Sequence, residues 1–206
     1  MIRLAALIAM VSLTGCVTGG SGTAASYRPH VDAIPLTMPK GAHPIAQQFM
    51  PLSPGGGAGH KGIDIAAPTG TPILAAAPGR VTISLWEPAY GNRVVIEHGV
   101  DDQGRRVQTL YFHLETRLVQ VGDRVDRGEQ IGTLGATGVL ASYPHLHFEY
   151  HRENAPGART ASGTNWWQGM TQLDPNRFWA DGVGRVTCFT GQDEPADKIT
   201  YPTACH

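Results

Sequence analysis

A mainly β fold, an antiparallel sheet or sandwich with short loops and little helix, is what this sequence of 206 residues predicts. Short apolar runs recur along the chain, and 26 glycines and 15 prolines punctuate them as turns do between strands. No long stretch follows the 3.6-residue period of an amphipathic helix. The chain is also only 16% charged and 41% hydrophobic, which disfavours disorder and coiled coil.

Individual strands are expected where apolar runs lie between turn residues. The clearest candidates are residues 73–76, 80–86, 93–97, 106–112 and 145–150, with very short strands inside 119–138. Asp101-Asp102-Gln103-Gly104 has the composition of a hairpin loop. Residues 151–173, including Trp166-Trp167, are expected to form a long loop. A helical turn follows at 174–179, with Asp174 as its N-cap.

The start of the chain has the layout of an export signal. One positive residue precedes an apolar run that is too short for the ~20 residues of a membrane-spanning helix. The run ends in Leu13-Thr14-Gly15-Cys16, which resembles the lipobox of bacterial lipoproteins, where the cysteine is lipid-modified and becomes the first residue. We therefore expect a signal peptide over 1–15 and lipidation of Cys16.

The residues after Cys16 predict a tether and a location. Segment 16–46 begins rich in glycine, serine, threonine and alanine and continues as a proline-containing extended stretch. Residues 27–47, which overlap that stretch, could lie across a functional site as a latch. Val17 is typical of lipoproteins sorted to the outer membrane. The expectation is an exported protein, anchored through its lipid at the periplasmic face of the outer membrane of a Gram-negative bacterium.

The remaining two cysteines and the charge balance add two further constraints. Cys188 and Cys205 form an even pair in an exported chain, so a disulfide is expected in the C-terminal tail, residues 181–206. Sixteen Lys and Arg against 17 Asp and Glu give a net charge of -1. A nucleic-acid-binding protein usually carries a strong positive excess, so nucleic acid is not expected as a partner.

Three short motifs place histidines in a chemical context. They are His60-Lys61-Gly62-Ile63-Asp64, Tyr111-Phe112-His113-Leu114 and His145-Leu146-His147-Phe148-Glu149. Alternate residues of a strand share a face, so His145 and His147 point the same way and need a cavity, a metal ion or both. Any one histidine alone would be read as a surface or core residue, but the three motifs together favour a site.

Zinc is the metal that these residue types suit. Catalytic zinc has three protein ligands from His, Asp and Glu, plus a water whose pKa it lowers to ~7. His60, Asp64 and either His145 or His147 supply such a set. The other histidine of that pair and His113 are then candidates to accept a proton or to stabilise an oxyanion.

The stretch from His60 to Glu149 resembles the lysostaphin/LytM-type zinc metallopeptidases, which cut peptide bonds in bacterial cell-wall peptidoglycan. Besides the histidine motifs, the resemblance rests on four segments: residues 91–99, 121–125, 128–132 and Thr137-Gly138. It implies an antiparallel β metallopeptidase core, placed here at residues 47–180. One departure from the family pattern is Ala141-Ser142-Tyr143, where small residues often precede Pro-His.

The resemblance also implies the roles of the five site residues. His60, Asp64 and His147 would be the ligands of one Zn²⁺ per chain, and His113 and His145 the catalytic pair beside them. The implied activity is that of a zinc-dependent endopeptidase acting on peptidoglycan stem peptides and their cross-links. In a Gram-negative wall the target would be the direct link between D-Ala and meso-diaminopimelate.

Two other functions are compatible with parts of the same sequence. A non-catalytic LytM-fold lipoprotein could bind the wall or activate an amidase, although the complete ligand set disfavours this alternative. Residues 119–132 also resemble biotinyl or lipoyl carriers. Such carriers need a lysine at a hairpin tip, and Lys40, Lys61 and Lys198 are not in such a hairpin.

Overall fold

The computed structural model describes residues 33–52, 59–158, 169–191 and 194–205. The expected signal peptide, the lipidation site Cys16 and Trp166-Trp167 lie outside these residues. Within them, all helix is confined to one short 3₁₀ turn, η1 (Pro175–Arg177), capped by Asp174 as predicted. No helix among the described residues is long and apolar enough to cross a membrane.

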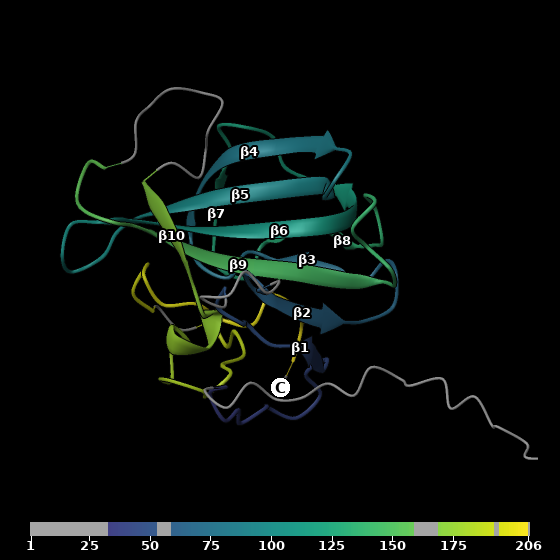
Figure 1. Ribbon diagram of the computed structural model, residues 1–206, viewed down its shortest axis with the longest axis horizontal. Helices are drawn as coiled ribbons and strands as arrows, with labels where there is room; N and C mark the ends of the chain where they lie inside the picture. The colour runs from purple at the N-terminus through teal and green to yellow at the C-terminus, as the bar shows by residue number, and fades with distance from the viewer. Residues whose placement is uncertain (1–32, 53–58, 159–168, 192–193, 206) are drawn as a thin grey trace, which may run out of the picture.

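Ten strands form one antiparallel sheet, which confirms the predicted fold class (Figure 1). The strands are β1 (Ile45–Gln47), β2 (Ile63–Ala66), β3 (Pro72–Leu74), β4 (Gly79–Glu87), β5 (Gly91–Val100), β6 (Arg106–Arg117), β7 (Arg124–Val125), β8 (Gln130–Leu134), β9 (His145–Glu153) and β10 (Met170–Leu173). Their order is β1-β2-β9-β6-β5-β4-β7, with β10 beside β9 and β8 between β3 and β6. The predicted hairpin loop joins β5 to β6.

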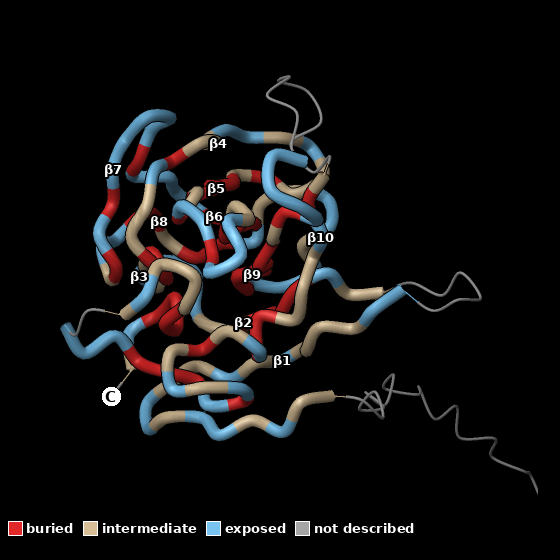
Figure 2. Tube along the Cα trace, turned by 90° about the vertical axis from the view of Figure 1, so that its left-hand side faces the viewer, coloured by how far each residue is buried: buried red, intermediate tan, exposed pale blue. Residues whose placement is uncertain are grey.

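The two faces of β9 differ in polarity. From β9, Leu146, Phe148 and Tyr150 enter the main hydrophobic core, where they join residues such as Ile63 and Ile65 of β2. The alternate residues of β9 are histidines and glutamates on the opposite face. Buried residues gather along β9, β6 and β5 (Figure 2). An apolar core behind the sheet therefore fixes β9, whose front face is polar, while a smaller apolar cluster of Val95, Leu110 and Phe112 covers the same face on β5 and β6.

One sequence expectation was wrong: residues 151–173 are not a continuous loop. Strand β9 runs on to Glu153, and β10 pairs with it from Met170↔Glu153 to Leu173↔Tyr150. His151 and Glu153 are polar, so this part of the sequence lacks the run of apolar residues from which the other strands were predicted. They are nevertheless 0% and 2% exposed, because each has polar partners inside the sheet.

The described segments before and after the predicted core contact each other. Thr37 pairs with Arg185, and the Tyr201 hydroxyl donates to the His43 carbonyl at 2.6 Å. A disulfide joins Cys188 to Cys205.

A buried arginine ties the C-terminal segment to the rest of the molecule. The Arg127 guanidinium donates to the carbonyls of Ala76, Glu194, Pro195 and Lys198. Ile199 and Tyr201 of that segment belong to the main core. The described parts of the tail are therefore built into the domain.

Gly62 allows β2 to lie against β9. A Cβ atom at this position would stand 2.2 Å from the Phe148 carbonyl oxygen and 2.9 Å from its carbon. Because both atoms are backbone, no side-chain rotation could relieve the clash. Gly62 therefore sets the approach of the two strands that carry Asp64 and His147.

We predict that Gly62→Ala forces β2 away from β9 and lowers the free energy of unfolding by about 1–3 kcal/mol. Urea denaturation measures this loss. Gly157→Ala is a suitable control, because Gly157 has a φ of 73° and open space around its Cβ position. The control should lose about 1–2 kcal/mol from backbone strain alone. Wild-type stability in Gly62→Ala would contradict the close approach.

Candidate metal centre

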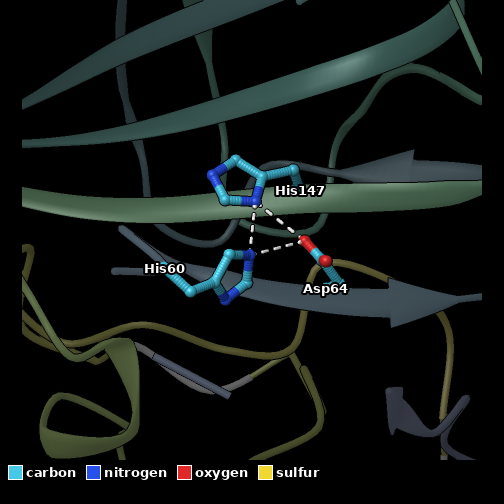
Figure 3. A group of neighbouring side chains, drawn as sticks. All are labelled: His60, Asp64 and His147. Atoms are coloured by element: carbon cyan, nitrogen blue, oxygen red, sulfur yellow. Dashed lines mark hydrogen bonds and ion pairs between the residues drawn. The ribbon is translucent and has the colours of Figure 1, made fainter. Parts of the chain in front are cut away.

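Three side-chain donor atoms converge beside the start of β2 and the middle of β9. His60 Nε2 lies 3.1 Å from Asp64 Oδ1 and 3.1 Å from His147 Nδ1, and the Asp64 and His147 atoms are 2.8 Å apart (Figure 3). Asp64 and His147 are opposite each other in the β2–β9 ladder. The structure thus brings together the three residues predicted as ligands, and of the β9 pair it is His147 that joins them.

Hydrogen bonds on the outer side of each imidazole direct a lone pair to the centre. His60 Nδ1 lies 2.9 Å from the Gln48 carbonyl oxygen, which can only accept, so this nitrogen carries the proton and Nε2 is free. His147 Nε2 lies 2.9 Å from Glu149 Oε1 and donates to that carboxylate. Its Nδ1 is then free to bind a metal. With Asp64 Oδ1, three acceptor atoms face one point.

The charge of the centre suits a divalent cation. Burial raises the pKa of the Asp64 carboxyl, but the contacts with His147 and His60 outweigh it and hold the pKa well below its usual range. Burial also raises the pKa of Glu149, but contacts with His147 and His151 lower it to about 2. Two ionised carboxylates therefore flank His147.

His147 responds to these two charges in the metal-free protein. Burial lowers the pKa of the His147 imidazole, but the contacts with Asp64 and Glu149 raise it to about 9. A proton on Nδ1 then occupies the position that a metal ion would take. Because a ligating histidine must lose that proton, metal binding at this centre releases it.

The donor set fits zinc. Two imidazole nitrogens and one carboxylate oxygen, with a fourth position left for water, are the usual protein ligands of a catalytic zinc ion. A tetrahedral ion with bonds of about 2.0–2.1 Å holds its ligands about 3.3 Å apart. The separations of 2.8–3.1 Å here are close to that value.

The predicted catalytic pair lies next to the three donors. The ring centroids of His113 and His145 are 4.8 Å apart. Each ring donates from Nδ1 to a backbone carbonyl at 2.8 Å, His113 to Thr137 and His145 to Tyr143. In the neutral form of each ring the lone pair is therefore on Nε2, and Nε2 of His145 is 3.8 Å from Asp64 Oδ1.

His113 is neutral and is held in an unusual backbone conformation. Burial lowers the pKa of its imidazole to about 4. Its φ of 62° is the only positive value among the described residues other than glycine. Its neighbour Phe112 already faces His147, so the left-handed turn brings two consecutive residues of β6 to the same region. Bonds from the His113 backbone N–H to the Tyr90 carbonyl and from its ring to Thr137 hold this turn.

All five predicted residues line one cavity of about 300 Å³. Tyr90, Leu140 and Tyr143 also line it, and the Tyr143 ring packs against that of His145 at a tilt of 32°, with ring centroids 4.5 Å apart. Of the described residues in the proposed latch segment, Gln47 alone lines the cavity. The end of this segment forms β1, which pairs with β2 at the edge of the sheet.

Sequence reasoning missed two features of the centre. No role was predicted for Glu149 or His151, yet Glu149 bonds to His147 and His151 is fully buried. The regular spacing of His145, His147, Glu149 and His151 was the available signal. His98, by contrast, lies away from the centre and contacts the Pro78 carbonyl and the Thr109 hydroxyl.

Comparison with known proteins gives a consistent result. Residues 58–158 match the family model described as peptidase family M23. The peptidoglycan DD-endopeptidase ShyC of Vibrio cholerae is 41% identical over 112 residues, which are 54% of this chain and 23% of ShyC. The uncharacterized lipoprotein YgeR of Escherichia coli is 43% identical over 103 residues, 50% of this chain and 39% of YgeR.

Among solved structures, the catalytic domain of lysostaphin from Staphylococcus simulans aligns with a TM-score of 0.44 and 28% identity, covering 68% of this chain and 86% of that one. This chain spans only 23% of ShyC and 39% of YgeR. The matched segment contains the whole candidate metal centre. Through its domain at residues 58–158, this chain belongs to peptidase family M23.

Proposed function

We propose that this protein is a zinc-dependent endopeptidase that hydrolyses peptide cross-links of bacterial cell-wall peptidoglycan. The observation that carries the proposal is the convergence of His60, Asp64 and His147 beside a histidine pair in one cavity. The name of ShyC, a peptidoglycan DD-endopeptidase, supports a bond between two D-centres as the target. The link between D-Ala and meso-diaminopimelate is such a bond.

In this proposal His60, Asp64 and His147 hold the metal. Bound there, zinc supplies a Lewis acid that polarises a carbonyl and makes water a better nucleophile. The protein contributes the placement of its donors, because Gln48 and Glu149 fix the ring nitrogens that face the centre. The cavity beside the donors leaves room for the substrate carbonyl.

His113 and His145 then move the protons of hydrolysis. As the water oxygen adds to the peptide carbonyl carbon, one proton passes to an unprotonated Nε2 of this pair. As the carbon–nitrogen bond breaks, a histidine of this pair that carries a proton on Nε2 donates it to the leaving amine. The Nδ1 bonds to Thr137 and Tyr143 keep both rings in the required tautomer and orientation.

We also propose that Cys16 carries lipid and that the domain acts at the periplasmic face of the outer membrane. The lipobox-like Leu13-Thr14-Gly15-Cys16 supports this placement, and the relative YgeR is named a lipoprotein. More than one acyl chain is needed for durable attachment.

We predict that the protein binds one zinc ion per chain and that Asp64→Asn weakens binding at least ~100-fold, since a neutral amide replaces a charged ligand. Chelator competition measures the zinc dissociation constant. Asp126→Asn, at an exposed position that does not line the cavity, is the control and should bind zinc as the wild type does. Equal zinc affinity in Asp64→Asn would exclude this centre.

The activity itself is tested on purified sacculi. With zinc, the wild type should convert cross-linked muropeptide dimers to monomers, as measured by liquid chromatography and mass spectrometry. His113→Ala and His145→Ala should keep zinc and lose about 10²–10⁴-fold in kcat, because each removes a proton carrier. Dimers that stay unchanged with zinc-loaded wild type would refute the endopeptidase and favour a non-catalytic wall protein.

A further inference from the structure

The polar row on β9 continues beyond the cavity into the protein interior. His145, His147 and Glu149 line the cavity, whereas His151 does not; Glu149 and His151 are 2% and 0% exposed. His151 Nε2 is 2.5 Å from Glu149 Oε2, and the other oxygen of Glu149 is 2.9 Å from His147 Nε2. Both oxygens of one buried carboxylate are therefore engaged by histidines of its own strand.

We propose that Glu149 and His151 form a positioning pair that sets the zinc affinity of the centre by holding His147 in its ligating orientation. This inference rests on the proposed function, because it takes His60, Asp64 and His147 as the zinc ligands. Neither member of the pair touches the metal position. Glu149 acts through His147, and His151 acts through Glu149.

The hydrogen-bond directions support this assignment. A carboxylate can only accept, so His147 donates from Nε2 and keeps Nδ1 for the metal. His151 likewise donates from Nε2, and its Nδ1 lies 3.5 Å from the Gln108 side-chain amide. If Glu149 turned away, His147 could take the other tautomer, with its proton pointing at the metal position.

His151 is needed because Glu149 is buried. Without a donor from His151, Glu149 Oε2 would lose this hydrogen bond in an interior where unpaired carboxylate oxygens are costly. The carboxylate would gain by rotating or shifting to find other donors. Either movement would release His147, so the effect of His151 reaches the metal through one intermediate group.

Two apolar residues of similar volume would fill positions 149 and 151 at a lower free-energy cost of burial. Replacing buried charged networks with apolar residues of similar volume is often neutral or stabilising. A purely structural role therefore gives no reason for a carboxylate and an imidazole directly behind a ligand. A positioning role does, since outer hydrogen bonds to a ligating histidine are worth 10–100-fold in metal affinity.

The test is the zinc dissociation constant of the full chain, measured by chelator competition. Glu149→Gln and His151→Leu should each weaken zinc binding about 10–100-fold. His151→Gln retains an N–H donor for Glu149 and should bind zinc within about threefold of the wild type. In the double variant, His151→Leu should add no further loss to Glu149→Gln, since it acts only through that carboxylate.

His98→Leu is the matched control for loss of a buried histidine. His98 lies on β5, is 5% exposed and bonds to Pro78 and Thr109. It should lose stability in urea denaturation yet keep wild-type zinc affinity. If His151→Leu does not fold, His151→Met removes the same donor with an unbranched side chain that adapts to the space.

Two results would overturn the proposal. One is a folded His151→Leu or His151→Met variant with the zinc affinity of the wild type. The other is a full additive loss in the double variant, which would show that His151 acts by a route other than Glu149. Failure of the wild type to bind zinc would instead refute the proposed metal centre, so the two failures are distinguishable.

Discussion

The antiparallel pairing of β2 with β9 is the constraint on which the rest of the centre depends. It places Asp64 opposite His147, while Ile65 and Leu146, the next pair in the ladder, enter the core. A register slip of one residue would exchange the two faces and bury the polar groups in the core. The packing of these apolar neighbours therefore fixes the register of the metal donors, and Gly62 lets the two backbones approach.

The polar face is stable because its charges are shared among several groups. Asp64 and Glu149 are both ionised and buried, and His147 lies between them with contacts to each. Removing any one member would leave a buried charge without its partner. That loss destabilises the folded protein far more than the intact pair stabilises it. The centre is therefore held as a unit, and it favours occupation by a positive charge, either a proton or a metal ion.

The sequence predicted the mainly β fold and the five residues of the site, because turn residues and histidine spacing are local signals. It could not decide from spacing alone between His145 and His147, since that choice depends on the register with β2. The left-handed turn at His113 needs the surrounding carbonyls and has no sequence signal. Strand β10 and the end of β9 were missed because they contain many polar residues. In the sequence alone, a strand whose polar residues find partners inside the protein looks like a loop.

His145 and His147 show how two identical side chains on one strand face acquire different roles. The Tyr143 carbonyl binds Nδ1 of His145 and leaves Nε2 free, whereas Glu149 binds Nε2 of His147 and leaves Nδ1 free. Nδ1 of His147 lies 2.8 Å from Asp64 Oδ1, and Nε2 of His145 lies 3.8 Å from it. The neighbour on the far side of each ring thus determines which histidine can ligate a metal and which can carry a proton.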